Sequence, residues 1–281
     1  MFEVIFLWVL ALVWIVFATV QDLKSREIAN WLNFSLIIFA LGFRFFYSLF
    51  SAADFTFFYQ GVIGLGIFFV IGNFLYYGRM FAGGDAKLMI ALGAVLPIYG
   101  TVMANASVFL TFLLLFFFSG AVYSLLVSGF FAVKNFKPFR KEFVSLFKKK
   151  QKILYPAMFV GLVVMVLGFI ESLFFILGIA FFLLPYFYVF AKAVDEACMI
   201  KKVKAKDLTE GDWLYKSVKV GSKRIKATWS GLSKKDIALI KKRYNKVEVR
   251  QGIPFTPAFL ISMVVLFILY LLGVKLWNPF V

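Results

Sequence analysis

The chain alternates between apolar runs long enough to cross a membrane and short polar stretches. About 20 consecutive apolar residues cross a bilayer as a helix, and the runs here predict about eight such spans. In order, these are Phe2–Val20, Leu32–Phe50, Thr56–Tyr77, Asp85–Tyr99, Ala106–Val133, two within Leu154–Val194, and Phe255–Trp277. The fourth is short for a full crossing, and Glu171-Ser172 predicts a tight turn that divides the Leu154–Val194 run.

The polar region before the last span is long enough to fold as a small domain. The predicted elements are a β-hairpin of Trp213–Val220 and Lys223–Trp229 about Gly221-Ser222, a helix over Ser233–Tyr244 with Ser233 as N-cap, and a strand over Lys246–Arg250. The strands are indicated by alternating apolar and polar side chains, and the helix by its cap and apolar face. We therefore predict an α+β domain over residues 195–253.

Composition and charge support a membrane protein and set its orientation. Of 281 residues, 63% are hydrophobic, whereas soluble domains are about half apolar. The formal net charge of +17 would suggest nucleic acid in a soluble protein. With the N-terminus outside, however, all Lys and Arg residues except Arg44 and Lys275 fall on the cytoplasmic side, as the positive-inside rule requires. We therefore expect contact with anionic lipid headgroups and none with nucleic acid.

These patterns predict an all-α polytopic membrane protein with the N-terminus outside and a small cytoplasmic α+β domain before the last helix. The predicted parts are a transmembrane bundle over 1–194, which includes a basic cytoplasmic loop at 134–152, the domain over 195–253, and a C-terminal transmembrane helix over 254–281. The loop could bind headgroups or dock a substrate. Arg44 is expected to reach the outer surface by snorkelling, or alternatively to pair with Asp54 or Glu171.

The content of cysteine and histidine restricts the chemistry. Cys198 is the single cysteine and there is no histidine, which excludes an intrachain disulfide, a four-cysteine zinc site and imidazole-dependent catalysis. We therefore expect no metal and no cofactor. Any acid–base chemistry must come from carboxyl, lysine or tyrosine side chains.

Two aspartates lie where apolar runs meet polar loops. Asp22 follows the first span, and Asp85 follows Gly83-Gly84 at the start of the fourth, so the predicted topology places both at the cytoplasmic face. Two close carboxyl groups share a proton, leaving one to activate water and one to protonate a leaving group. The structural alternatives are that Asp85 is a helix N-cap, which would favour its ionised form, and that Asp22 ends the first span paired with Arg26.

Two motifs carry a resemblance to a known family. They are Asp22-x-x-x-Arg26-x-Ile28-x-Asn30 and Gly84-Asp85-Ala86-Lys87. The chain resembles the type IV prepilin peptidases, which are intramembrane aspartyl proteases of the GxGD type, with Ala82 in place of the first glycine. Three later segments resemble the archaeal branch, which includes preflagellin (prearchaellin) peptidases; they are Gly211-Asp212-Trp213, Gly231-Leu232-Ser233 and the stretch from Gly252 to Phe259.

The resemblance implies that Asp22 and Asp85 are the catalytic pair. It also implies supporting or substrate-binding roles for Gly83, Gly84, Lys87, Arg26 and Asn30. The N-cap argument favours Asp85 as the base that deprotonates water and Asp22 as the donor to the leaving amine, although a coupled pair titrates as a unit.

The implied activity is removal of the short basic leader of prepilin-like or prearchaellin precursors at the cytoplasmic face of the cell membrane. Bacterial relatives that N-methylate the product carry a Cys-x-x-Cys zinc domain, so a chain with one cysteine is expected to cleave without methylation. Two alternatives remain open from the residues alone. One is a transporter or proton pathway that uses intramembrane carboxylates; the other is a non-catalytic assembly scaffold.

Overall fold

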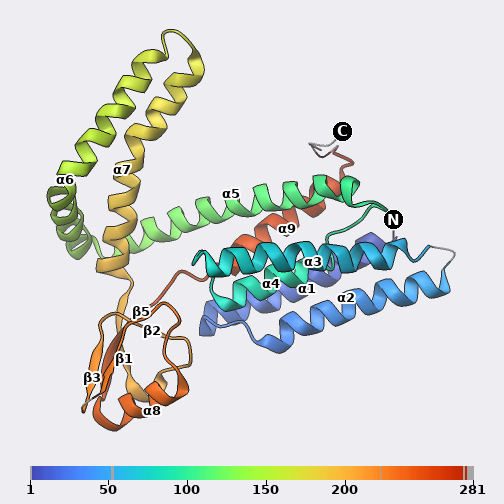
Figure 1. The fold of residues 1–281 in the computed structure, drawn as a ribbon, viewed down its shortest axis with the longest axis horizontal. Helices are drawn as coiled ribbons and strands as arrows, with labels where there is room; N and C mark the ends of the chain where they lie inside the picture. Colours follow the sequence, from blue (N-terminus) through green and yellow to red (C-terminus); the bar gives the residue numbers. More distant parts are fainter. Residues whose placement is uncertain (1, 52–53, 222, 275, 277–281) are drawn as a thin grey trace. The chain divides into compact units, whose positions relative to one another are not determined.

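The computed structural model describes residues 2–51, 54–221, 223–274 and 276 (Figure 1). Its helices are α1 (Phe2–Ser25), α2 (Asn30–Phe50), α3 (Thr56–Tyr77), α4 (Gly83–Gly93), α5 (Val102–Lys134), α6 (Phe136–Leu167), α7 (Ser172–Cys198), the 3-10 turn η1 (Ala205–Asp207), α8 (Lys234–Arg243) and α9 (Thr256–Leu271). Its strands are β1 (Ile200–Lys204), β2 (Trp213–Leu214), β3 (Val218–Val220), β4 (Lys223–Ile225) and β5 (Lys246–Arg250). The chain forms two compact units, one of residues 1–124 and 254–281 and the other of residues 125–253.

Six of the helices are long and apolar enough to cross a membrane, namely α1, α2, α3, α5, α6 and α7. The prediction of a polytopic helical membrane protein is therefore confirmed. The other two predicted spans are shorter helices. The 11 residues of α4 rise only about 16 Å, roughly half of the hydrocarbon thickness. Helix α9 has 16 residues, and Trp277, the predicted end of this span, lies outside the described residues.

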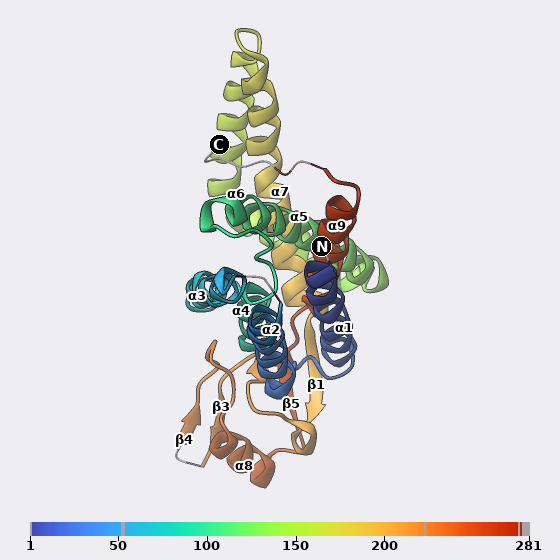
Figure 2. The ribbon, with the colours of Figure 1, turned by 90° about the vertical axis from the view of Figure 1, so that its right-hand side faces the viewer.

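In the first unit, α1 to α4 and α9 run alongside one another, and Figure 2 shows α1, α2 and α3 nearly end-on. Large side chains from several helices fill the centre, including Trp8, Phe68, Phe112, Phe116 and Phe259. Other large apolar side chains, such as Phe69 and Val70, are mostly exposed. Apolar groups on the outside are expected where lipid replaces water as the solvent.

Close backbone contact between α3 and α4 depends on glycine. A Cβ atom added to Gly64 would overlap the carbonyl oxygen of Gly93, and one added to Gly93 would lie 2.6 Å from the Cβ atom of Phe68. Small residues let membrane helices approach and gain dispersion contacts along their backbones. The short α4 is therefore packed directly against α3.

Arg44 is fully buried, and the prediction that it snorkels to the surface is wrong. Its guanidinium donates to the carbonyl oxygens of Ala94 (2.8 Å), Val95 and Pro97, which follow α4, and of Phe57 on α3. The carbonyls at a helix C-terminus lack intrahelical donors and carry partial negative charge. Backbone oxygens therefore accept its hydrogen bonds in place of the predicted carboxylates.

In the second unit, α6 and α7 form an antiparallel hairpin that turns at Glu171, the residue before α7, as predicted. The stretch 134–152 is helical and not a loop, because α6 starts at Phe136. Its phenylalanines recur at intervals of three or four residues, and two of them contact α7: Phe139 packs against Phe190 and Phe147 against Tyr186. This apolar stripe stabilises a helix where the density of lysine had suggested a solvated loop.

The α+β part of the second unit contains a three-stranded antiparallel sheet in the order β1-β5-β2 and the hairpin β3-β4. The predicted hairpin is confirmed for β3 and β4 alone, because Trp213–Leu214, the start of its predicted first strand, forms β2 and pairs with β5. Ser222, in the predicted turn, lies outside the described residues. The predicted N-cap is also confirmed, because the Ser233 hydroxyl accepts from the Asp236 backbone N–H. This hydroxyl also donates to the Asp236 carboxylate at 2.7 Å and lowers the pKa of that carboxyl.

Candidate active site

Asp22 lies inside α1, one turn before its end, and not in the loop that the sequence predicted. Its side chain is 7% exposed. It continues the buried face of α1, on which Ala11, Ile15 and Ala18 also lie. The helical repeat of 3.6 residues therefore turns this carboxyl into the bundle.

The Asp22 carboxylate is bound by the start of α9. Its Oδ2 atom accepts a hydrogen bond from the backbone N–H of Thr256 at 3.2 Å and another from the Thr256 hydroxyl at 2.9 Å. Thr256 is the first residue of α9 and is fully buried. Sequence reasoning did not single it out as a site residue. The available signal was a threonine before Pro257 at the start of an apolar run, which is common at helix starts.

Asp85 is the third residue of α4, so the predicted N-cap role is wrong. The helix begins at Gly83 and its N-cap is Ala82, because the two glycines form the first turn. The Asp85 carboxylate reaches back and accepts a hydrogen bond from the Ala82 backbone N–H. This is the arrangement of the third helical residue in a capping box. The side chain is half-buried.

The structure brings the two carboxyl groups together. Those of Asp22 and Asp85, from α1 and α4, interact electrostatically. Close carboxyl groups cannot both ionise freely, so such a pair holds a shared proton and can supply one base and one acid. Tyr123 of α5 also interacts electrostatically with Asp22. The sequence offered no signal for Tyr123, because it lies among many aromatic residues of an apolar run.

Lys87 and Asn30, predicted as supporting residues, contact each other. The Lys87 ammonium donates to the side-chain oxygen of Asn30 at 2.6 Å. This bond joins the first turns of α4 and α2. Because Asp85 lies in the same turn as Lys87, the contact also fixes the start of α4 beside the loop that follows Asp22.

The two predicted glycines have different surroundings. A Cβ atom on Gly84 would lie 3.2 Å from the Cβ of Ile28, whereas one on Gly83 would meet only the ring of Tyr76 at 3.8 Å. Gly84 therefore permits the loop after α1 to pack closely on α4. Gly83 has no comparable contact.

Arg26 terminates α1 in a left-handed conformation, with φ of 59°. Its backbone N–H donates to the Asp22 carbonyl at 2.8 Å, and its charge interacts with Tyr123. A left-handed conformation is uncommon outside glycine and asparagine and often marks a functional segment. Among the residues that the structure describes, no group of three or more His, Cys, Asp or Glu side chains could hold a metal ion.

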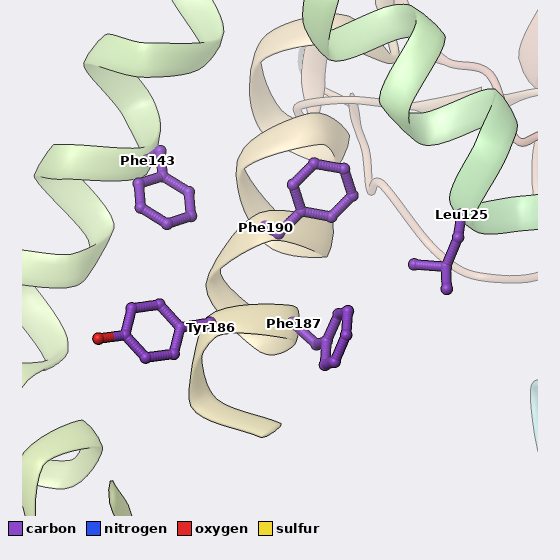
Figure 3. Close-up of a pocket in the computed structure, with 5 residues that line it drawn as sticks. All are labelled: Leu125, Phe143, Tyr186, Phe187 and Phe190. Carbon is purple, nitrogen blue, oxygen red and sulfur yellow. The ribbon is translucent and has the colours of Figure 1, made fainter. Parts of the chain in front are cut away.

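An apolar hollow of about 440 Å³ lies in the second unit and does not contain the aspartates (Figure 3). Its lining is Leu125, Phe143, Tyr186, Phe187 and Phe190. Figure 3 shows Tyr186 directed toward α6 and Phe187 directed to the side of α7 on which Leu125 lies. The Tyr186 hydroxyl is the one polar side-chain group in this lining. The hollow suits an apolar chain and lacks the carboxyl groups that hydrolysis would need.

The match to a family model concerns the part of the chain that contains both aspartates. Residues 9–125 match the model of the type IV leader peptidase family. This part of the chain is similar to the type IV leader peptidase family. The family match covers α2 to α4 and most of α1 and α5, and it includes Asp22, Asp85 and Tyr123.

Three curated relatives are similar over part of their length, and all are called preflagellin peptidase. The protein of Methanocaldococcus jannaschii is 37% identical over 82 residues, which is 29% of this chain and 34% of the relative. That of Methanococcus maripaludis is 32% identical over 83 residues, which is 30% of this chain and 35% of the relative. That of Methanococcus voltae is 28% identical over 135 residues, which is 46% of this chain and 57% of the relative. The chain thus spans between a third and somewhat over half of these relatives. No solved structure matches it.

Proposed function

We propose that this chain is a membrane aspartic endopeptidase that removes the short basic leader from prepilin-like or prearchaellin precursors. In this proposal cleavage takes place at the cytoplasmic face of the cell membrane and is not followed by N-methylation. The match to the type IV leader peptidase family and the names of the methanogen relatives support the leader-peptidase activity. The predicted orientation supports the cytoplasmic face.

The observation that carries the proposal is the electrostatic contact between Asp22 and Asp85 inside the family segment. Hydrolysis of an amide requires a base to activate water and an acid to protonate the leaving nitrogen. Two carboxyl groups that share one proton provide both functions without histidine or a cofactor. The hydroxyl groups of Thr256 and Tyr123, which both interact with Asp22, are further polar groups at this location.

The position of the pair suits a substrate whose cleavage site lies next to an apolar helix. Asp22 is in the last turn of α1 and Asp85 is in the first turn of α4, so both lie where apolar helices meet polar loops. A precursor helix inserted in the membrane would leave its leader in the polar region. Its scissile bond would then lie at the level of the carboxyl groups.

The test is cleavage of a co-expressed precursor in membranes by Asp22→Asn and Asp85→Asn variants. Each substitution removes an acid–base group without changing side-chain size, so we expect a loss of at least about 10²-fold in rate. Asp54→Asn, at an exposed carboxyl between α2 and α3, is the matched control and should cleave normally. Immunoblots verify equal amounts of enzyme, and mass spectrometry of the product reports the new N-terminus and any methyl group.

Full cleavage by Asp22→Asn or Asp85→Asn would end the proposal and would favour a scaffold or a transport role. A methylated product would contradict only the absence of methyl transfer.

A further inference from the structure

The two carboxyl groups of the pair receive different hydrogen bonds. A single oxygen of Asp22, Oδ2, accepts both donors of Thr256. Asp85 accepts one backbone N–H, from Ala82. Hydrogen bonds donated to a carboxylate favour its ionised form, so two convergent donors favour that form more than one does.

The local sequence at the start of α9 leaves the backbone N–H of Thr256 available to donate a hydrogen bond outside the helix. The first N–H groups of a helix have no intrahelical acceptor. Pro257, the second residue of α9, has no N–H, and the N–H of Ala258 already donates to the Phe255 carbonyl at 3.0 Å. The N–H of Thr256 therefore points out of the helix end toward Asp22. A negative charge at this location is also favoured by the helix dipole.

We infer that Thr256 is a positioning residue that holds Asp22 as the ionised partner of the pair, so that Asp85 carries the shared proton. This inference rests on the proposed function. It makes Asp22 the base that deprotonates water, whereas the N-cap prediction gave this role to Asp85; that prediction fails because Ala82 is the N-cap of α4.

The resulting reaction balances in protons. Asp22 takes a proton from water as the water oxygen bonds to the scissile carbonyl carbon, and Asp85 gives its proton to the carbonyl oxygen. The carbon–nitrogen bond of the tetrahedral diol then breaks as Asp22 passes its proton to the leaving nitrogen. Asp85 recovers a proton from a diol hydroxyl, which leaves a carboxylic acid, an amine and the starting enzyme.

Titratable groups from two packed helices interact with Asp22. Asp85 comes from α4 and Tyr123 from α5, and Arg26, which follows Asp22, interacts with Tyr123. On α9 the first titratable residue after Thr256 is Tyr270, and α2 has no charged residue before Arg44. The Thr256 hydroxyl is a donor to Asp22 that a single substitution outside the pair can remove.

The experiment is the pH dependence of precursor cleavage by Thr256→Val and Thr256→Ser variants. Valine has the shape of threonine and lacks the hydroxyl, so the ionised form of Asp22 loses one donor. One hydrogen bond to a charged group corresponds to about one pH unit. We expect the acid limb of the kcat profile to move up by about that amount, with little change in KM, and we expect serine to restore it.

The matched control is Thr19→Val. Thr19 is also buried on α1, one turn before Asp22, but its hydroxyl donates to the Ile15 carbonyl of its own helix at 2.7 Å. This variant loses a buried hydroxyl in the same core and should keep the wild-type pH profile. Asp22→Asn and Asp85→Asn are assayed in parallel.

A wild-type profile for Thr256→Val, with both asparagine variants inactive, overturns the inference and leaves the proposed function intact. An equal loss of rate at every pH that serine does not restore also overturns it, because that result indicates a structural role alone. Normal cleavage by either asparagine variant instead overturns the proposed function.

Discussion

At the scale of single residues, partners that lie far away in the sequence decide what each polar side chain does. Asp22 was identifiable from the sequence because a carboxyl group at the end of an apolar run costs free energy, which marks it as a candidate functional group. Its partner Thr256 was not, since a hydroxyl at a helix start usually serves that helix alone. Arg44 also stood out in the sequence as a charged residue within an apolar run. Its acceptors are backbone oxygens, which the pattern of side chains does not reveal.

Arg44 gives the prediction at this scale. Arg44→Met would leave carbonyl oxygens of α3 and of the segment after α4 without donors inside the bundle. Buried polar groups left unpaired are expensive, so we expect the free energy of unfolding to fall by at least about 3 kcal/mol. Reversible SDS titration in mixed micelles, followed by circular dichroism, measures this quantity.

Arg140→Met is the control for Arg44, because Arg140 lies on the exposed face of α6. Its effect should stay within about 0.5 kcal/mol. Equal effects of the two substitutions would show that the buried hydrogen bonds of Arg44 contribute nothing to stability.

At the scale of elements, the short α4 is held at both ends and along one side. The Lys87–Asn30 bond lies in its first turn, the Arg44 guanidinium binds the carbonyls just after it, and glycine contacts join it to α3. An 11-residue helix is marginal by itself. Its packing, more than its own sequence, therefore holds Asp85 in place.

Two glycines of α3 give a matched test of this packing. A methyl group on Gly64 would overlap the Gly93 carbonyl and the Pro97 ring, whereas one on Gly66 would meet no atom within 4 Å. We expect Gly64→Ala to lower the free energy of unfolding by about 2 kcal/mol. Gly66→Ala should be neutral or stabilise by up to about 1 kcal/mol, since alanine favours a helix.

The same SDS titration reports both glycine variants. If Gly64→Ala were as stable as Gly66→Ala, the close approach of α3 and α4 would not be a constraint on the fold. The precursor assay should follow stability here, because displacing α4 moves Asp85.

At the scale of the whole molecule, the charge pattern predicts an orientation that the helices alone do not define. Six helices can cross a membrane, yet a helix can be inserted either way round. The asymmetric distribution of Lys and Arg decides between them through the positive-inside rule. In the proposed topology, this rule predicts the cytoplasmic side for the aspartates and for the basic residues of α6 and the α+β part.

Cys198, the single cysteine of the sequence, makes this orientation testable. It is unpaired and partly exposed at the end of α7. A membrane-impermeant thiol reagent should label it in inverted vesicles and leave it unlabelled in intact cells. In a Cys198→Ser background, Asp54→Cys should show the reverse. Labelling of Cys198 in intact cells would contradict the proposed topology and would indicate the inverse orientation, with the aspartates outside.

The sequence by itself determined where the apolar helices run, where the α6–α7 turn falls, and which two carboxyl groups stand out. These features are local, because burying or exposing a stretch of chain depends on its own side chains. Only the tertiary structure decided that 134–152 is helical, that Arg44 binds carbonyls, and that Thr256 binds Asp22. Each depends on which faces of distant helices meet, and packing geometry between segments far apart in the chain leaves no periodic signal in the sequence.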